Sequence, residues 1–254
     1  MRFAYLGSGS SGNALLVESG STRILLDCGF PLKETLLRLQ RLGVEGHSLT
    51  AIVVTHEHDD HVSGVGRLAR KFALPVWLTR GTWRGSRGSL EETTLHFIEG
   101  YQSLQIGDLE VTPFPVPHDA GEPAQYVFSD GAVKLGVLTD VGKATTHIRS
   151  VLSGCDALAL ECNHDVEMLQ RGPYPPALKS RVGGAFGHLS NDQAMDLLRG
   201  LDRSRLRHVI GVHLSRQNNT PALARRALSE ALGCSPEWVG VADQDLGLDW
   251  RQLS

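Results

Sequence analysis

The chain has 254 residues, enough for one large domain or two small ones. Hydrophobic residues make up 41% of it and charged residues 21%, proportions that are ordinary for a globular protein with an apolar core. The net charge of -3 excludes an overall positive field that would attract nucleic acid, although local basic patches can still bind phosphates.

The cysteines and the N-terminal segment predict a cytoplasmic protein. The four cysteines are scattered and show no C-x-x-C spacing, which is typical of a chain kept reduced inside the cell. The sequence begins with a strand-like run, MRFAYLG, rather than an apolar signal region, and no stretch reads as a membrane span.

The first third of the chain is rich in strand patterns. A polar glycine-rich loop, SGSSGN, follows the first strand, and Gly20-Ser21 joins the next two into a predicted hairpin. Apolar residues at helical spacing predict a helix that ends before Gly43 and another after the fourth strand. The expected strands are 2–7, 14–19, 22–29 and 49–55, and the expected helices are 32–42 and 62–73.

The remainder continues with further strands and helices. Strands are expected at 75–79, 109–116, 124–130, 132–140, 156–161, 208–215 and 237–242, and helices at 143–152, 191–200 and 221–232. Asp130-Gly131 signals a two-residue hairpin. Two strand-rich blocks, each followed by helices, predict one mixed α/β domain over 1–254, with two sheets face to face and helices outside.

The densest chemical signal is VVTHEHDDH, which runs from Val53 to His61 after a buried strand. His56 and His58 are two residues apart at the end of an extended segment, so they point the same way and can reach one centre. Asp60 and His61 fall in the following turn and can reach a second centre. Imidazole and carboxylate ligands suit zinc, manganese or iron.

Two metals need more ligands than this segment provides, and three strand ends offer them. His118 follows FPVP, Asp140 ends GVLTD, and His213 ends VIGV. Each residue stands where a strand meets a loop, which is the usual place for site residues. The carboxylate of Asp140 can bridge both ions.

The motif T-H-x-H-x-D-H, followed by His, Asp and His at strand ends, resembles the metallo-β-lactamase fold superfamily. The resemblance implies an αββα sandwich with a dinuclear site at one edge of its sheets. It assigns the first metal to His56, His58 and His118, the second to Asp60, His61 and His213, and the bridge to Asp140. It also makes Asp27 a residue that orients the site, although a strand-end aspartate that caps a turn is an open alternative.

Four further stretches, LGSGSSGNA, LECNHD, YPPALKSRVGGAFGHLSN and VHLSRQNN, resemble the YycJ/WalJ branch of that superfamily. Members of this branch are bacterial cytoplasmic enzymes described as single-strand DNA exonucleases. The same stretches are similar to the catalytic half of tRNase Z, although this chain lacks its long flexible arm. The resemblance implies a hydrolase with two divalent ions that acts as a phosphodiesterase on single-stranded DNA.

His188 remains after seven ligands have been assigned. A two-metal site supplies hydroxide for attack on phosphorus at neutral pH, but it leaves the departing oxygen without a proton. In the tRNase Z resemblance a glutamate at the position of Glu161 pairs with the loop histidine as proton donor, which predicts a Glu161–His188 pair. Ser190-x-x-Gln193 is a capping-box pattern that would fix this loop. The alternative is that His188 is an ordinary loop histidine in contact with water. Asp60 is predicted to be catalytic as well as a metal ligand.

Several residues are candidates for substrate contacts. Ser8, Ser10 and Ser11 lie in a glycine-rich loop that can form an anion nest or an ordinary tight turn. Arg216 and Asn218 closely follow a predicted ligand, so they should flank the metals. His164 either touches substrate or braces its loop with Asp165. Residues 67–87 are locally basic and include Trp83 as a candidate stacking platform, or they form a solvated helix face.

Two other functions stay open on the sequence alone. The same ligand cluster serves hydrolases of small phosphodiesters and of thioesters, and the negative net charge fits a small substrate. A non-catalytic metal or nucleic-acid binding module is a third class. The complete set of ligand positions argues against that class.

Overall fold

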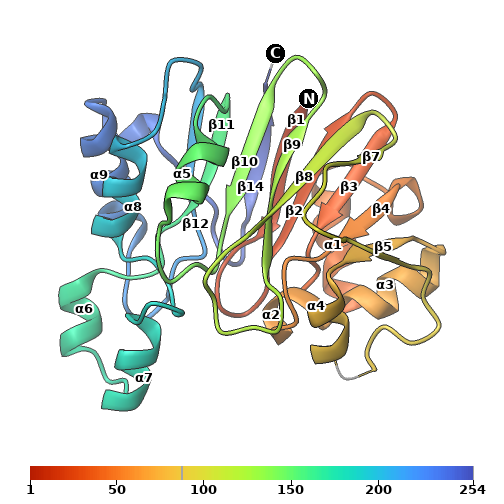
Figure 1. The fold of residues 1–254 in the computed structure, drawn as a ribbon, viewed down its shortest axis with the longest axis horizontal. Helices are drawn as coiled ribbons and strands as arrows, with labels where there is room; N and C mark the ends of the chain where they lie inside the picture. The colour runs from red at the N-terminus through yellow and green to blue at the C-terminus, as the bar shows by residue number, and fades with distance from the viewer. Residues whose placement is uncertain (87, 254) are drawn as a thin grey trace.

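The computed structural model describes residues 1–86 and 88–253. Within those ranges two seven-stranded mixed sheets lie face to face, with helices on the outer faces (Figure 1). The predicted αββα sandwich is therefore confirmed. Arg87, the last residue of the predicted basic segment, lies outside the described residues.

The first sheet is antiparallel on one side and parallel on the other. Its order is β14 (Leu248–Gln252), β1 (Arg2–Gly7), β2 (Ala14–Ser19), β3 (Thr22–Leu26), β4 (Ala51–Val53), β5 (Val76–Leu78) and β6 (Leu95–Phe97). The predicted hairpin of β2 and β3 is confirmed, since Ser19 pairs with Thr22. The sequence analysis did not anticipate β14, which pairs antiparallel with β1.

The second sheet has the same arrangement. Its order is β13 (Gly240–Val241), β12 (His208–Val212), β11 (Ala157–Glu161), β10 (Lys134–Leu138), β9 (Ala124–Ser129), β8 (Leu109–Pro115) and β7 (Leu104–Ile106). The predicted two-residue turn after β9 is wrong, because the ladder closes at Ser129 and Lys134 and leaves four residues in the loop. Asp130 stabilises the longer loop, because its Oδ1 accepts the backbone N–H groups of Ala132 and Val133.

Helices cover both outer faces and extend from one end (Figure 1). They are α1 (Leu32–Arg41), α2 (Asp59–Val62), α3 (Val65–Phe72), α4 (Arg80–Gly85), α5 (Thr146–Leu152), α6 (Val166–Arg171), α7 (Pro176–Val182), α8 (Asn191–Arg199) and α9 (Pro221–Leu232), with 3-10 turns at Gly46–Ser48 and Pro236–Trp238. The predicted helix 62–73 corresponds to α3, which begins at Val65, whereas Val62 ends the separate short helix α2. The chain turns at Gly64, whose N–H bonds the carbonyl of Cys28 and whose Cβ, if present, would lie 2.0 Å from the Phe30 oxygen.

The core explains why most strands read as continuous apolar runs. Alternate residues of β1 point in opposite directions, so Phe3 packs between the sheets while Ala4 packs under the outer helices. Tyr126 and Phe128 of β9 join Phe3 between the sheets. Leu198 of α8 packs in the layer beyond the second sheet. Both faces of each sheet are therefore covered.

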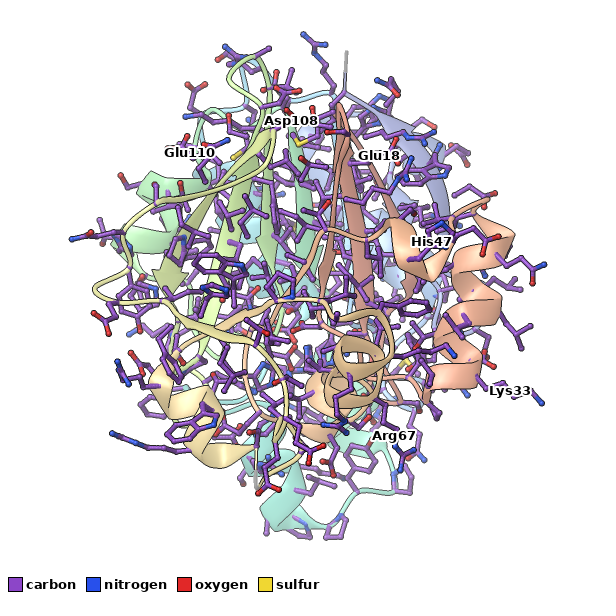
Figure 2. All side chains as sticks on the ribbon, turned by 90° about the vertical axis from the view of Figure 1, so that its right-hand side faces the viewer. Glu18, Lys33, His47, Arg67, Asp108 and Glu110 are labelled. Carbon is purple, nitrogen blue, oxygen red and sulfur yellow. The ribbon has the colours of Figure 1, made fainter. Side chains whose placement is uncertain are left out.

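Charged side chains stand outward on one helix-covered side of the sandwich and at one of its ends. Figure 2 shows Lys33 and Arg67 on the side that carries α1 and α3. Glu18, Asp108 and Glu110 lie at the end opposite the projecting α6–α7 pair (Figure 2). In the described part of the chain, no helix combines the length and the apolar character that crossing a bilayer requires.

Candidate metal centre

The candidate site lies at one edge of the sandwich, where strands of both sheets end. Asp27 follows β3, His56 follows β4, Asp140 follows β10, Glu161 ends β11, and His213 follows β12. Parallel strands place their carboxyl ends at the same edge, so residues far apart in the sequence meet there. All five side chains are buried, which shields their interactions from water.

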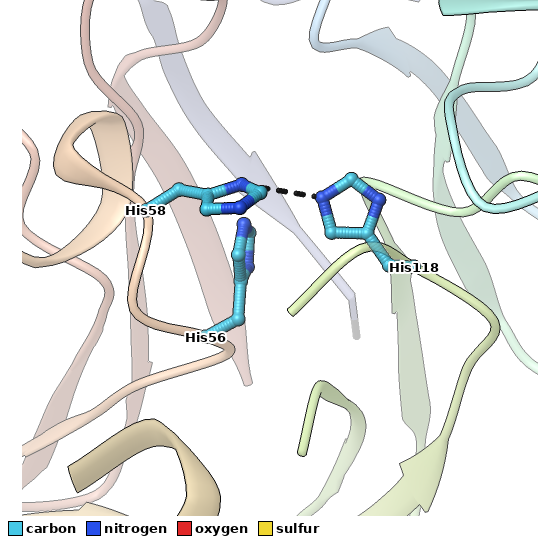
Figure 3. A group of neighbouring side chains, drawn as sticks. All are labelled: His56, His58 and His118. Carbon is cyan, nitrogen blue, oxygen red and sulfur yellow. Dashed lines mark hydrogen bonds between the residues drawn. The ribbon is translucent and has the colours of Figure 1, made fainter. Parts of the chain in front are cut away.

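The first group of metal-ligating side chains is His56, His58 and His118. Figure 3 shows their three imidazoles turned toward one another, with the dashed line joining His58 Nδ1 and His118 Nε2, which are 3.3 Å apart. One ligand nitrogen from each ring lies within 4.8 Å of the other two. Nε2 of His56 is buried and has no hydrogen-bond partner. The predicted first set of ligands is thus assembled around one point.

The second group is Asp60, His61 and His213. Oδ2 of Asp60 lies 3.2 Å from Nε2 of His213 and 3.5 Å from Nε2 of His61. Their ligand atoms also lie within 4.8 Å of one another. This group matches the predicted second set of ligands.

Asp140 lies between the two groups. Its Oδ2 is 3.0 Å from Nε2 of His61, and its Oδ1 is 3.6 Å from Nε2 of His213 and 3.8 Å from Nε2 of His118. Oδ2 is buried and accepts no hydrogen bond, despite its closeness to His61. A carboxylate in this place can contact cations held by either group, as a bridge requires.

Protein hydrogen bonds occupy the other ring nitrogen of each candidate ligand. These contacts are His56 Nδ1 to Thr55 Oγ1 at 3.0 Å, His58 Nε2 to the Asp119 carbonyl at 3.2 Å, His61 Nδ1 to Asp27 Oδ2 at 2.7 Å, His118 Nδ1 to the Gly187 carbonyl at 3.1 Å, and His213 Nδ1 to Glu161 Oε1 at 3.2 Å. Such contacts orient metal-binding imidazoles and select their tautomer. They leave Nε2 of four histidines, and Nδ1 of His58, directed at the centre.

Three residues of the site adopt a backbone conformation that non-glycine residues rarely use. Asp27, Asp140 and His213 have φ angles of 61°, 48° and 54°. Each of them follows a strand, and the left-handed turn redirects its side chain toward the centre. Such local strain is concentrated at functional sites because the surrounding structure must hold it. Sequence reasoning had no signal for this feature.

These residues fit a divalent metal. Two buried polar atoms, His56 Nε2 and Asp140 Oδ2, have no hydrogen-bond partner, and a buried polar atom without a partner is costly. Both belong to a group of nitrogen and carboxylate donors that converge on one point. Zinc, manganese and iron accept such donors. A bound cation would therefore satisfy the atoms that the protein leaves unpaired.

Glu161 and His188 form the predicted pair beside the ligands. Oε1 of Glu161 lies 2.8 Å from Nδ1 of His188, and Oε2 accepts backbone N–H groups of Val141 and Leu189, each at 3.0 Å. Burial raises the pKa of Glu161, but the neighbouring His188 and His213 outweigh it and lower the pKa to about 2. Burial lowers the pKa of His188, but the charge and hydrogen bond of Glu161 outweigh it and raise the pKa.

The loop that carries His188 is held on both sides. Ser190 and Gln193 form the predicted capping box at the start of α8. The N–H of His188 donates to the Val182 carbonyl at 2.8 Å. Leu189 is fully buried beneath the loop. His188 is thus fixed between an anchored helix start and a buried carboxylate.

Comparison with known proteins agrees with this geometry. The family described as Beta-lactamase superfamily domain matches residues 22–214. The chain belongs to the beta-lactamase superfamily. The resemblance predicted from its motifs is confirmed, and this member, with its clustered ligands, is a metal-dependent hydrolase.

Three proteins are similar to this beta-lactamase superfamily member to different degrees. Exodeoxyribonuclease YycJ from Bacillus anthracis is 36% identical over 245 residues, which cover 95% of this chain and 93% of that protein, so the chain belongs with the YycJ branch. Ribonuclease Z from Methanopyrus kandleri is 34% identical over 136 residues, which cover 46% of each chain. The solved structure of Zn²⁺-bound PqqB from Methylobacterium extorquens has a TM-score of 0.78 at 17% identity over the full length of both chains, which shows the shared fold alone.

The glycine-rich loop of this hydrolase supports the site from one side. Ser8 is buried, and its Oγ accepts the N–H of His213 at 2.9 Å. Ser10 and Ser11 are exposed, so two of the three predicted serines are accessible to a ligand. Nδ2 of Asn13 lies 3.3 Å from Oδ2 of Asp60. The loop therefore braces candidate metal ligands, and its anion-binding role stays a prediction.

The other predicted substrate contacts are placed less favourably. Arg216 is exposed and pairs with Asp245 at 2.6 Å. Asn218 is fully buried, so it offers no surface to a substrate. His164 is buried with Nδ1 unpartnered, and Asp165 caps α6 by accepting the Met168 N–H, which leaves the alternative of a His164 brace without support. Arg216 is held in an ion pair and the other two residues are buried, so the substrate roles of all three stay predictions.

The described part of the basic segment is mostly a solvated or internally bonded surface. Arg67 stands outward on α3 (Figure 2), Arg70 donates to a backbone carbonyl, and Arg80 pairs with a glutamate. Trp83 is 43% exposed and packs edge-on against the ring of Phe97. The contacts of Arg70 and Arg80 therefore favour the alternative of an ordinary solvated face for much of the segment.

One part of that segment borders the site. A cavity of about 780 Å³ lies between the histidine motif and the loop after α4, and His58, Asp59, Arg84 and Ser86 line it. Its volume falls within the range of pockets that hold organic ligands. Arg84 is exposed and makes no ion pair within the described residues. A substrate seated at the ligands can extend into this space.

Proposed function

We propose that this protein is a phosphodiesterase with two divalent metal ions, an exonuclease that acts on single-stranded DNA. The observation that supports it most directly is the 2.8 Å contact between Glu161 and His188, beside two groups of candidate ligands. A hydrolase that only activates water needs the ligands alone. A held imidazole beside them adds a proton donor, which a nucleic-acid ester with a poor leaving group requires. The similarity to an exodeoxyribonuclease supports DNA as the substrate.

Different residues serve the attack on phosphorus and the departure of the leaving oxygen. When bound, two cations at these groups would supply a nucleophile at neutral pH and stabilise the charge that develops on the phosphoryl oxygens. Nδ1 of His188 is hydrogen-bonded to Glu161. Nε2 is therefore the nitrogen that donates a proton to the leaving oxygen. Glu161 favours the protonated form of His188, since its charge and its hydrogen bond raise the pKa of that imidazole. Asp60 takes part as a ligand and as a charge next to His213.

The proposal is tested by the substrate range of the purified protein. The assay compares labelled single-stranded DNA, double-stranded DNA, RNA, a cyclic nucleotide and a glutathione thioester, each with zinc, manganese or iron. We expect single-stranded DNA to be shortened progressively from an end. Hydrolysis of the thioester alone would reject the nuclease, and preference for the cyclic nucleotide would assign the enzyme to small phosphodiesters.

A further inference from the structure

An aromatic side chain stands exposed beside the proposed proton donor. Phe186 is 62% exposed, and among the large apolar side chains of the described residues only Leu246, at 76%, is more exposed. It precedes His188 by two positions in GGAFGH. Single exposed apolar residues are common, so exposure alone assigns nothing. The position and the surroundings of Phe186 carry the argument.

The backbone around Phe186 is fixed to the loops that carry candidate ligands. The Phe186 carbonyl accepts the N–H of Asp119 at 3.1 Å, directly after His118. Gly142, two residues after Asp140, packs so closely that a Cβ there would lie 2.5 Å from the Phe186 nitrogen. The exposed ring therefore stands on a rigid support next to the metal-binding edge.

The surface beside Phe186 carries one positive charge without an ion pair in the described residues and a second that an aspartate offsets. Lys143 follows Gly142, is exposed, and makes no ion pair in the part of the chain that the structure describes. The side chain of Arg181 is 61% exposed while it pairs with Asp119 at 2.6 Å. Both belong to segments that pack against the Phe186 loop. The unpaired charge of Lys143 favours an anionic occupant.

The neighbouring helix α7 has the character of a contact surface rather than of a packing element. No residue of α7 is buried, and with α6 it projects from the end of the sandwich (Figure 1). Its last turn carries Lys179 and Arg181. A helix without buried residues gains little from packing against the core.

From these observations we propose that Phe186 is a stacking platform for the base of the nucleotide on the leaving side of the scissile phosphate. This inference rests on the proposed function. A proton donor lies next to the leaving oxygen, so the residues beside His188 adjoin the leaving nucleotide. Unpaired bases stack on aromatic rings while basic side chains contact the phosphates. Bases in a duplex are already stacked, so the platform favours single strands.

The test compares Phe186→Ala, Phe186→Leu and Phe186→Trp in the metal-loaded protein. We expect Phe186→Ala to raise KM for oligothymidylate about fivefold to a hundredfold, the range that loss of one base–aromatic stack produces. Phe186→Trp should restore the wild-type KM, whereas Phe186→Leu, which keeps apolar volume without a flat ring, should not. Equal KM values in wild type and Phe186→Ala would overturn the proposal.

Two substrate series distinguish the loss of base stacking from a displacement of the proposed proton donor, His188. Thymidine p-nitrophenyl phosphate keeps a base on the retained side and releases an aryl group, so Phe186→Ala should leave its hydrolysis unchanged. A loss there comparable to the loss on DNA would mean a displaced His188 loop, and the proposal would fall. The second series is oligothymidylate in which one abasic residue is moved along the strand. At one position the missing base should raise the KM of the wild-type protein to the value measured for Phe186→Ala. The KM of Phe186→Ala itself should not change at that position.

A matched control uses another exposed aromatic residue. Trp238 is 45% exposed and precedes β13, which runs parallel to β12, so it lies at the end of these strands opposite His213. Trp238→Ala should leave KM for oligothymidylate unchanged. Sedimentation of wild type and Phe186→Ala checks the competing occupant, a second copy of the chain. A dimer that dissociates on this substitution would overturn the proposal.

Binding distinguishes this inference from the proposed function. Affinity for a fluorescein-labelled phosphorothioate oligothymidylate, which resists hydrolysis, is measured by fluorescence anisotropy. An affinity that depends on Phe186, without hydrolysis of DNA, would reject the proposed nuclease function and support the proposed stacking on Phe186. Hydrolysis of DNA with no dependence on Phe186 would keep the nuclease and reject the platform. Absence of both binding and hydrolysis would reject both.

Discussion

Oε1 of Glu161 lies 2.8 Å from Nδ1 of His188, and both groups are held by backbone hydrogen bonds. The same oxygen lies 3.2 Å from Nδ1 of His213. One buried carboxylate therefore orients a candidate metal ligand and a candidate acid at once. Substitutions at these three positions should affect metal binding and proton transfer to different degrees.

Replacement of His188 by alanine should remove proton donation and leave the ligands intact. We expect the single-turnover rate on single-stranded DNA to fall about 10²- to 10⁴-fold, the usual contribution of a general acid. Bis(p-nitrophenyl) phosphate, whose leaving group needs no proton, should be hydrolysed at nearly the wild-type rate. His147→Ala is the control, because His147 is an exposed histidine on α5. Equal losses on both substrates would contradict the acid role.

Replacement of Glu161 by glutamine should weaken both functions. The variant loses the charge that holds the proton on His188 and an acceptor that orients His213. We expect slower DNA hydrolysis together with a 10- to 100-fold lower metal affinity, which is typical when a partner of a metal ligand is lost. Metal content after dialysis against a graded chelator measures the second effect. Under the same dialysis His188→Ala should keep its metal, and a matching loss in both variants would mean that His188 itself binds metal.

The sequence predicts the elements whose physical signal is local. Strand patterns locate β2 and β3 and their hairpin, and the Ser190–Gln193 spacing predicts the capping box, because these features depend on a few neighbouring residues. The histidine motif likewise lies within nine residues of a single strand end. Its geometry follows from the alternation of side chains along an extended segment.

Features that depend on distant partners escape such reasoning. β14 is a strand because it pairs with β1, almost the whole chain away. Asn218 follows a predicted ligand closely, yet the turn after β12 buries it. The left-handed φ of His213 belongs to a non-glycine residue and leaves no compositional trace. Exposure of Phe186 is likewise visible only once the loops around Gly142 are in place.

A pair of asparagines behind the site should contribute to the stability of the fold. Nδ2 of Asn219 donates to Oδ1 of Asn191 and to the Cys162 carbonyl, and Nδ2 of Asn191 donates back to Oδ1 of Asn219, at 2.7–2.9 Å. Both residues are buried, so Asn219→Ala leaves polar groups without partners. We expect the free energy of unfolding in urea to fall by about 1–3 kcal/mol.

A surface asparagine-to-alanine exchange is not available as a control for that variant, because the chain's other asparagines near the site are also buried. Gln40→Ala serves instead, since Gln40 is an exposed amide on α1. Its free energy of unfolding should match that of wild type. The asparagine pair would carry no stability if both variants unfolded at the same urea concentration.

Replacement of Asp27 by asparagine tests the support of His61 without altering the shape of the chain. Asparagine tolerates the left-handed φ of 61° at this position, whereas alanine would add strain. Oδ2 of Asp27 lies 2.7 Å from Nδ1 of His61 and also accepts the Thr55 hydroxyl at 2.9 Å, and an amide nitrogen there can accept neither. We expect metal affinity to fall 10- to 100-fold while the fold is retained.

The control for Asp27→Asn is Asp59→Asn, which removes the same charge from an exposed residue of the histidine motif. Metal content after chelator dialysis and the circular dichroism spectrum are measured for both variants. Loss of metal in Asp27→Asn alone, with an unchanged spectrum, is expected because, of these two aspartates, Asp27 is the one whose carboxylate is hydrogen-bonded to a candidate ligand. If Asp27→Asn kept its metal as firmly as wild type, the aspartate would serve only to hold Thr55 and the turn after β3. The orientation of His61 would then come from Thr55, whose Oγ1 lies 3.3 Å from Nδ1 of that ring.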